Sequence, residues 1–395
     1  MAYAKSMNSL EIFAGGGGLA LGVTVAGFAH VSLIEWDTNS AKTLYHNHKQ
    51  FGFNNEKEWI FNDDIHNVSF SSYQDKIDLL SGGPPCQPFS IGGKHRAYND
   101  KRDLFSEATR TLAEIRPKAF IFENVRGLLR KNFSKYFSYI ILQLTYPEIV
   151  KKENEKWIEH LARLEQYHTS TSEKSLHYKV VFRLLNAADY GIPQKRERVF
   201  IIGFRSDING NWSFPIATHS EEALHYEKYI SKKYWEKHSV KYPNKYEPVN
   251  ASLFDPPEKK PWVTVRDAIG DLPNPTETNN YYNHKFQGGA KAYPGHTGSV
   301  MDEPAKTIKA GAHGVPGGEN MIVLDDGALR YLTVREAARI QTFPDNYFFP
   351  CSWTESMRQI GNAVPVKLGA IVADSVKRTL YSAKGKRKNN GYGDF

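Results

Sequence analysis

The sequence predicts an α/β fold in which a doubly wound, mostly parallel sheet is accompanied by a second, smaller, loop-rich domain. In the first half of the chain, short apolar strands alternate with helical patterns, as is typical of a parallel sheet wound by helices. A glycine run at residues 15–18 joins the first strand pattern to the first helical one. From about Ser206 to Leu329 this alternation gives way to proline, glycine, tyrosine and lysine, which predicts the second domain.

The first half contains four expected strands, each a short apolar run bounded by polar or turn-forming residues. Between the last two, apolar residues from Leu104 to Ile115 recur at helical spacing, and Pro117 ends that helix. This helix and its two flanking strands form a β-α-β unit. The expected strands are residues 9–13, 31–36, 76–83 and 119–125.

Four chemical groups follow or end these strands: the glycine run, Glu35, Cys86 and Glu123. Ligands of open parallel sheets lie beyond the carboxyl ends of the strands, so we expect these groups on one edge of the sheet. Cys86 follows "GGPP", a run that can continue neither a helix nor a central strand and must be a loop. From these residues alone, a buried structural cysteine and a reactive one are equally open.

The remaining elements are predicted by charge and capping patterns. Residues 147–174 are rich in Glu, Lys and His, which indicates an inserted surface helix with no assigned chemistry. Strand patterns follow at 179–192 and 193–204. Capping residues predict helices that begin after Thr264 and Thr333, each with an acid three residues later. The last apolar helix covers 364–380, and the charged tail from residue 384 is expected to be disordered. No internal repeat is present.

Composition narrows the class of protein. The 395 residues carry a formal charge of +8, which favours a polyanionic partner. Between Lys228 and Lys260, lysines interleave with tyrosines and a tryptophan. These residues would contact phosphates and bases, or they form an ordinary solvated face. No apolar run of membrane-spanning length or signal-like start occurs, so a cytoplasmic protein is expected. Cys86 and Cys351 lack the spacing of a zinc site, so no metal is expected.

The glycine run leaves three interpretations open. Glycines between a strand and a helix let the backbone approach a ligand closely, and Glu35 lies at a suitable distance along the chain to bind ribose hydroxyls. This pattern is compatible with a nicotinamide-dependent enzyme, with a methyltransferase that uses S-adenosylmethionine, or with a flexible turn.

Eight motifs considered together resemble those of the DNA cytosine-5 methyltransferases. They occur in the order typical of that family, and the resemblance covers about residues 9–204 and 329–376. The motifs are "FAGGGG" (13–18), "EW" (35–36), "DDI" (63–65), "GGPPCQPFS" (82–90), "ENV" (123–125), "QKRERVFIIG" (194–203), "RYLTVREAARIQTFPDNY" (330–347) and "RQIGNAVPVKL" (358–368).

The resemblance implies an S-adenosylmethionine-dependent methyltransferase fold and a covalent mechanism. Cytosine C5 is a poor nucleophile, and addition of a thiolate at C6 makes C5 reactive toward a methyl sulfonium. Cys86 would be that nucleophile, because the thiolate is the reactive form. Arg196 and Arg198 would supply positive charge near it, and Glu123 would bind N3 and the exocyclic amine of the base.

The resemblance also implies a set of binding residues. For Trp36, ordinary core packing is the alternative to a cofactor contact, and Asp63 is the alternative to its neighbour Asp64. The implied S-adenosylmethionine contacts are Phe13, Gly15, Gly17, Gly18, Leu19, Glu35, Trp36, Asp64, Ile65, Pro85, Asn362 and Val364, and the implied DNA contacts are Gln87, Ser90 and Thr307.

The domain boundaries follow from where the resemblance ends. A catalytic and cofactor-binding domain is expected at 1–204 plus 358–395, a target-recognition domain at 205–332 and a hinge segment at 333–357. The target base must be flipped out of the duplex before the chemistry. The implied enzyme belongs to a type II restriction-modification system. It acts as a nucleoid-associated monomer on double-stranded DNA, and a cognate endonuclease shares its site without a stable complex.

Three other functions remain open from the sequence. An RNA (tRNA) cytosine-5 methyltransferase of the same fold would share the catalytic motifs, but the long recognition region argues against it. A nicotinamide-dependent oxidoreductase would explain the glycine run and leave "PPCQ" and "QKRER" without a role. A DNA-binding protein without catalysis would explain the charge but not the cysteine at the end of a strand.

Overall fold

The computed structural model describes residues 7–55, 59–85, 104–170, 175–243, 255–294, 297–310 and 320–389. The chain divides into two compact units. The first unit comprises Met1–Leu185, Glu197–Phe214 and Gly369–Phe395, and the second comprises Asn186–Arg196 and Pro215–Leu368.

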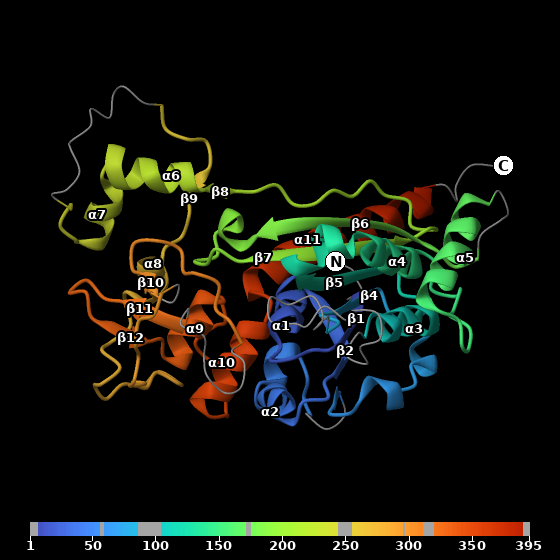
Figure 1. Ribbon diagram of the computed structural model, residues 1–395, viewed down its shortest axis with the longest axis horizontal. Helices are drawn as coiled ribbons and strands as arrows, with labels where there is room; N and C mark the ends of the chain where they lie inside the picture. Colours follow the sequence, from blue (N-terminus) through green and yellow to red (C-terminus); the bar gives the residue numbers. More distant parts are fainter. Residues whose placement is uncertain are drawn as a thin grey trace. The chain divides into compact units, whose positions relative to one another are not determined.

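A seven-stranded sheet, counted over the described residues, forms the centre of the first unit (Figure 1). Its strand order is β3-β2-β1-β4-β5-β7-β6. The strands from β3 to β5 pair in parallel, and β7 is antiparallel to β5. The strands are β1 (Met7–Ile12), β2 (Phe28–Ile34), β3 (Ile60–Phe61), β4 (Leu79–Gly82), β5 (Ala119–Val125), β6 (Tyr178–Asn186) and β7 (Glu197–Arg205).

Helices accompany this sheet as the alternating pattern predicts, and the α/β fold class is confirmed. The predicted helix between Leu104 and Ile115 is α3, which ends where Arg116 adopts a left-handed conformation before Pro117. The helices are α1 (Gly18–Val25), α2 (Thr38–His46), α3 (Phe105–Ile115), α4 (Ser134–Thr145), α5 (Trp157–Thr169) and α11 (Val366–Asn389), the last of which begins in the second unit.

Several sequence expectations differ from the structure. The strand expected at 179–192 ends at Asn186, and Ala187–Tyr190 form a short 3-10 helix instead. The strand β3 was not predicted, because two residues carry no detectable periodicity. The expectation of disorder from residue 384 is wrong for residues 384–389, which continue α11. Lysine and arginine have good helix propensity, and the apolar first part of α11 is buried, so the helix has a stable base from which to extend.

One large apolar core holds the first unit together. Strand β5 is buried on both faces, as a central parallel strand requires, and only its last residue is partly accessible. Helix α3 contributes an apolar stripe at helical spacing that includes Phe105, Ala108 and Leu112. Helices α4 and α5 pack beside it in the same core. The carboxyl ends of β1, β2, β4 and β5 are therefore fixed relative to one another.

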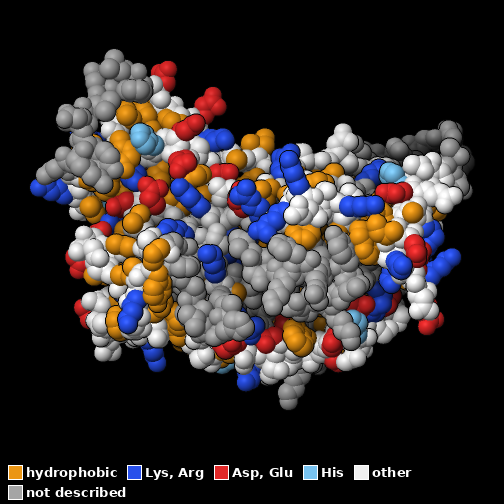
Figure 2. Space-filling view, viewed as in Figure 1, with side chains coloured by type: hydrophobic (Ala, Val, Ile, Leu, Met, Phe, Trp, Pro, Cys, Tyr) orange, Lys and Arg blue, Asp and Glu red, His pale blue; other side chains and the backbone are white. Residues whose placement is uncertain are grey.

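The second unit consists of short elements joined by long loops, as its composition predicts. The capping boxes expected at Thr264 and Thr333 are both present. On the face shown in Figure 2, acidic and basic side chains are intermixed rather than separated. Its elements are β8 (His219–Ser220), α6 (Glu221–His225), α7 (Lys233–His238), β9 (Lys260–Pro261), α8 (Val265–Ile269), β10 (Ser299–Val300), β11 (Met321–Val323), β12 (Leu329–Tyr331), α9 (Val334–Ile340) and α10 (Trp353–Asn362).

The lysine and aromatic segment of the second unit is partly a core. Tyr234 and Trp235 are buried in one apolar cluster with Trp262. Lys228 is buried as well, and its ammonium donates to the Glu303 carboxylate at 2.7 Å. The rings of Tyr234 and Trp235 therefore pack in the core of the second unit and are not available to contact nucleotides.

The described part of the chain contains no helix that is both long and apolar enough to span a membrane.

Candidate active site

The register of the parallel strands aligns the ends from which the candidate site is built. Ile12 of β1 pairs with Ile34 of β2 and with Gly82 of β4, and Gly82 pairs with Phe122 of β5. The next residues along these four strands therefore form a row at the carboxyl end of the sheet. They are Phe13, Glu35, Gly83 and Glu123.

The turn after β1 has the backbone of a ligand-binding loop. Phe13, Gly15 and Gly17 have positive φ angles of 55°, 54° and 80°. Phe13 is not a glycine, so this conformation is strained, and such strain clusters at functional sites. A Cβ at Gly15 would meet no atom of the described residues within 4 Å, so these residues leave free space beside it. Gly17 caps α1, whose first residues Gly18 and Leu19 are buried.

Glu35 closes this turn from the end of β2. One carboxylate oxygen accepts the Gly15 backbone N–H at 2.7 Å, and the other accepts the Asp37 N–H at 2.8 Å. Trp36, the next residue, has 72% of its side chain surface exposed. Core packing, the alternative interpretation of Trp36, is therefore excluded, and its ring is free to stack on a ligand.

The loop after β3 lies next to these residues. The Asn62 side-chain amide donates to the backbone carbonyls of both Glu35 and Trp36 at 2.9 Å. Asp64 caps the short helical turn that starts at the buried Ile65, and it accepts hydrogen bonds from the backbone and the ring of His66. These bonds lower the pKa of Asp64, so it is a carboxylate at neutral pH. The choice of Asp64 over Asp63 stays a prediction.

A buried ion pair stands at the end of β5. The Glu123 carboxylate lies 2.9 Å from Nε of Arg198 on the neighbouring strand β7, and their side chains are 9% and 13% exposed. Burial lowers the pKa of Arg198, while the charge of Glu123 opposes this change. The adjacent Asn124 donates to the Pro84 carbonyl at 3.0 Å, which ties β5 to the loop that leads toward Cys86.

Several predicted residues cannot be placed in this arrangement. Pro85 is the last described residue of its loop, and Cys86, Gln87 and Ser90 lie outside the described residues. Four others belong to the second unit, and they are Arg196, Thr307, Asn362 and Val364. Thr307 donates to the Lys195 carbonyl at 2.7 Å, and Asn362 is exposed at the end of α10 while Val364 is buried.

Arg196 has partners of a different kind from Arg198. Its side chain is fully buried, and its guanidinium donates to the backbone carbonyls of Ile308, Gly361 and Ala363 at 2.8–3.0 Å. The expectation that Arg196 supplies charge to a thiolate stays a prediction. These bonds give the side chain a role in holding two segments of backbone together, one at Ile308 and one at Gly361 and Ala363.

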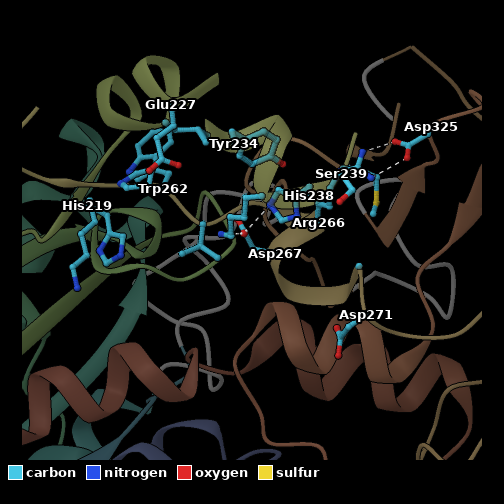
Figure 3. Close-up of a pocket in the computed structure, with 17 residues that line it drawn as sticks. His219, Glu227, Tyr234, His238, Ser239, Trp262, Arg266, Asp267, Asp271 and Asp325 are labelled. Carbon is cyan, nitrogen blue, oxygen red and sulfur yellow. Dashed lines mark hydrogen bonds and ion pairs between the residues drawn. The ribbon is translucent and has the colours of Figure 1, made fainter. Parts of the chain in front are cut away.

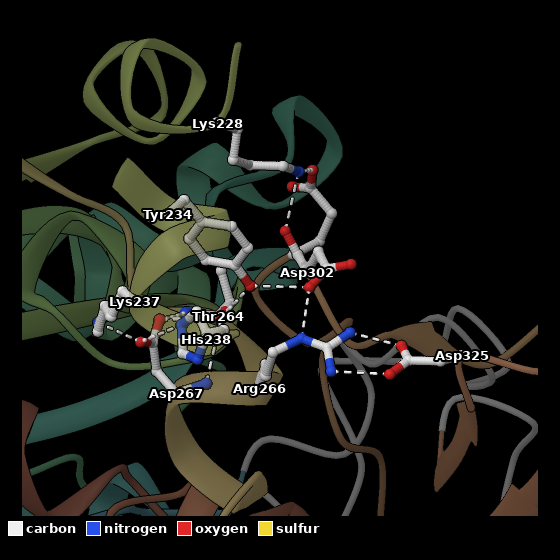
Figure 4. A network of polar contacts seen from close by, with 10 residues as sticks. Lys228, Tyr234, Lys237, His238, Thr264, Arg266, Asp267, Asp302 and Asp325 are labelled. Atoms are coloured by element: carbon white, nitrogen blue, oxygen red, sulfur yellow. Dashed lines mark hydrogen bonds and ion pairs between the residues drawn. The ribbon is translucent and has the colours of Figure 1, made fainter. Parts of the chain in front are cut away.

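The second unit also has a pocket of about 900 Å³, and the described residues that line it include none of the predicted site residues (Figure 3). Its charged side chains are largely engaged with one another. Arg266 forms a two-point ion pair with Asp325 and a single bond to Asp302, and Asp267 binds Lys237 (Figure 4). We assign no chemistry to this pocket.

Glu11 is a residue that the sequence reasoning did not single out. It lies in β1, is 1% exposed, and accepts the Ser81 hydroxyl at 2.6 Å and the Ala20 backbone N–H. The Ala20 carbonyl in turn accepts Nε2 of His30 at 2.8 Å. Because Ala20 lies in the first turn of α1, Glu11 and His30 fix the start of this helix behind the glycine turn. The only signal was an acid within an apolar strand pattern.

Glu11 makes stability depend on pH, because burial raises its pKa from 4.5 to about 8. The folded state holds this proton more tightly than the unfolded state, so the contribution to stability is complete below pH 4.5 and is lost as pH rises toward 8. We expect Glu11→Gln to become progressively more stable than the wild type over this range, by up to about 5 kcal/mol. Urea denaturation of both proteins between pH 5 and 9 measures this difference. Parallel stability curves would contradict it.

Comparison with known proteins agrees with this geometry. The family model for C-5 cytosine-specific DNA methylase matches residues 7–378. Type II methyltransferase M.PspPI of Psychrobacter sp. (strain TA137) is 33% identical over 96% of this chain and 81% of its own length. Type II methyltransferase M.FnuDI of Fusobacterium nucleatum is 31% identical, over 95% of both chains.

Solved structures share the fold. The S. pombe Dnmt2 methyltransferase aligns with a TM-score of 0.55 and 17% identity, covering 95% of this chain and 99% of its own. Entamoeba histolytica methyltransferase EhMeth aligns with a TM-score of 0.54 and 15% identity, over 96% and 99% of the two chains. Given the family match over nearly the whole chain, the protein belongs to the C-5 cytosine-specific DNA methylase family and is a DNA cytosine-5-methyltransferase.

Proposed function

We propose that this enzyme transfers a methyl group from S-adenosylmethionine to C5 of a flipped-out cytosine in a specific duplex DNA site. The observation that carries the proposal is the buried Glu123–Arg198 pair, which stands in the same row of strand ends as the strained glycine turn and Glu35. This common position supports a proton-transfer role for Glu123 and a nucleoside-binding role for the glycine turn.

The residues that follow β1, β2 and β3 fit S-adenosylmethionine. The free space beside Gly15 lets a ligand approach the backbone, the exposed Trp36 offers a face to adenine, and the carboxylates of Glu35 and Asp64 suit hydroxyl and amine groups. When bound, S-adenosylmethionine supplies an electrophilic methyl group on a sulfonium. We propose that the cofactor also contacts the other residues that the family resemblance implies, which are Phe13, Gly17, Gly18, Leu19, Ile65, Pro85, Asn362 and Val364.

Three residues of the chain, Cys86, Glu123 and Arg198, take part in the remaining chemical steps. The Cys86 thiolate adds to C6 of the cytosine, and the π electron pair of the C5–C6 bond becomes available at C5. C5 would take the methyl group, whose bond to the sulfonium sulfur would break to leave S-adenosylhomocysteine. Glu123 takes up a proton from solvent as the bound base buries it, donates this proton to N3 as the thiolate adds, and takes it back when the thiolate leaves. Arg198 fixes the position of the Glu123 carboxyl group, since the two are 2.9 Å apart and both nearly buried. The C5 proton then passes to solvent water, the electrons of the C5–H bond restore the C5–C6 double bond, and Cys86 leaves as a thiolate to release 5-methylcytosine.

Further parts of the chain would contact the DNA, read its sequence and allow the domains to move. We propose that Gln87, Ser90 and Thr307 contact the DNA, that residues 205–332 read the target sequence and that residues 333–357 act as a hinge. Base flipping exposes C6 to the nucleophile, because a stacked base hides it. The names of the Type II relatives support a place in a restriction-modification system with a cognate endonuclease.

The exposed Trp36 provides a test of the cofactor site. We expect Trp36→Ala to weaken binding of S-adenosylmethionine by about tenfold or more, because a stacking face is lost. The melting temperature of the free protein should stay unchanged, since the ring is 72% exposed. Trp59→Ala is the matched control, because Trp59 stacks on Phe53 within the unit at 5.9 Å between ring centroids. Calorimetric titration that shows equal affinity for wild type and Trp36→Ala would contradict this assignment.

One assay tests both the methylation reaction and whether its substrate is DNA or RNA. The purified protein is incubated with S-adenosylmethionine and either mixed-sequence duplex DNA or transfer RNA, and the nucleosides are analysed by mass spectrometry after digestion. We expect 5-methyldeoxycytidine from the DNA and no 5-methylcytidine from the RNA. Methylation of the RNA alone would retain the chemistry and overturn the substrate.

A further inference from the structure

Three buried side chains in the second unit form one polar cluster, which we call the buried hub. They are Gln194, Arg196 and Gln341, and each has 0% of its surface exposed. Buried polar groups are costly unless they are hydrogen-bonded, so such a cluster persists only where its bonds are made. The partners of these bonds are backbone groups in two segments, residues 305–310 and 360–363.

Arg196 binds both segments with one guanidinium. Its Nη1 donates to the carbonyl of Ile308 at 3.0 Å, and its Nη2 donates to the carbonyls of Gly361 and Ala363 at 2.8 and 2.9 Å. The last two residues are the immediate neighbours of Asn362. A planar guanidinium fixes the directions of these bonds, which a lysine ammonium would not do.

The two glutamines bind the same two segments. Gln194 accepts the backbone N–H of Ile308 and donates to the side chain of Gln341, both at 3.0 Å. Gln341 donates to the carbonyls of Ile360 and Ala363 at 2.7 and 3.2 Å. Ile308 and Ala363 are thus each held by two members of the hub.

The two segments also touch directly through their backbones. A Cβ on Gly361 would lie 2.4 Å from the amide nitrogen of Ala310, so this position has no room for a side chain. At the start of the first segment, Thr307 donates to the carbonyl of Lys195, which lies between the hub residues Gln194 and Arg196. No part of this arrangement can shift without breaking buried hydrogen bonds.

We infer that the buried hub couples DNA binding to cofactor binding by holding Thr307, a DNA contact, and Asn362 with Val364, the cofactor contacts, in one rigid arrangement. The inference rests on the proposed function for these three contact residues. Because the hub makes the two segments move as one body, a ligand that favours one position of its segment favours the matching position of the other, so the second ligand binds more tightly. Arg196 and Gln341 are positioning residues in this account and touch neither ligand.

The experiment compares affinity for S-adenosylhomocysteine, the methyl-transfer product of the cofactor, with and without a duplex that the wild type methylates. We expect the duplex to tighten binding by about tenfold in the wild type, and by no more than about twofold in Arg196→Lys and Gln341→Met. If Arg196→Lys does not fold, Gln341→Met decides the question, since it keeps the volume of the side chain and removes only its hydrogen bonds.

Arg335→Lys is the matched control. Arg335 is also fully buried in the second unit and donates to three backbone carbonyls, those of Tyr282, Pro344 and Tyr347, but these lie outside the two coupled segments. It should lose stability and keep the tenfold effect. Retention of the effect in Gln341→Met, or its equal loss in Arg335→Lys, would overturn the inference. A wild type that binds neither S-adenosylhomocysteine nor DNA would instead refute the proposed function, and this is seen without any variant.

Discussion

Cys86→Ser should abolish methylation of DNA, lowering the rate by at least about 10⁴-fold, the scale on which loss of a nucleophile is felt in covalent enzymes. A serine hydroxyl stays protonated at neutral pH and cannot add to C6 as a thiolate does. Binding of S-adenosylmethionine and of DNA should be retained, because neither affinity depends on the covalent bond. Single-turnover methylation with labelled cofactor measures the rate, and titrations measure the two affinities.

Cys351→Ser is the control for this experiment. Cys351 is the other cysteine of the chain, is partly buried, and its sulfur lies 3.7 Å from the side-chain nitrogen of Gln359. It belongs to no candidate site, so this variant should keep the wild-type rate. A Cys86→Ser enzyme that still methylates DNA at the normal rate would show that the nucleophile is misassigned.

Glu123→Gln should have the next largest effect, a fall in the methylation rate of about 10²- to 10⁴-fold. The amide keeps the shape of the side chain but cannot pass a proton to N3 of the base. The change also leaves the buried guanidinium of Arg198 without its carboxylate, so a lower melting temperature is expected as well. The rate is measured at a temperature where both proteins are folded, with saturating DNA and cofactor.

Glu148→Gln separates the loss of the proton-transfer group from the loss of an ion pair. Glu148 pairs with Arg116 at 2.7 Å within the first unit, and neither residue is a candidate site residue, so its loss should affect stability alone. If Glu123→Gln and Glu148→Gln methylate equally fast, the proton-transfer role of Glu123 is wrong.

Sequence reasoning predicted the elements of the fold where signals are local. The capping boxes at Thr264 and Thr333 are set by residues three positions apart, and the strands of the first half are marked by continuous apolar runs. The row of strand ends followed from a general property of parallel sheets. Such signals need no knowledge of distant parts of the chain.

The features that were missed depend on distant contacts. The carbonyl partners of Arg196 lie 112 to 167 residues away along the chain, so no local pattern indicates that this side chain holds them, and its role as a charge near the nucleophile stays a prediction. Glu11 is surrounded by Ser81 and Ala20, which only the folded sheet brings near. The aromatic residues near Lys228 were compatible with a nucleic-acid surface until the structure placed Tyr234 and Trp235 in a core.

The central claim is that this chain methylates C5 of cytosine at a defined site in duplex DNA. Bisulfite sequencing of mixed-sequence duplex DNA after incubation with the protein and S-adenosylmethionine tests it most directly, because every 5-methylcytosine is mapped at once. The account predicts a single short motif methylated on both strands, with none in a parallel reaction that contains Cys86→Ser. Duplex DNA that stays unmethylated under conditions where the protein binds S-adenosylmethionine would contradict it.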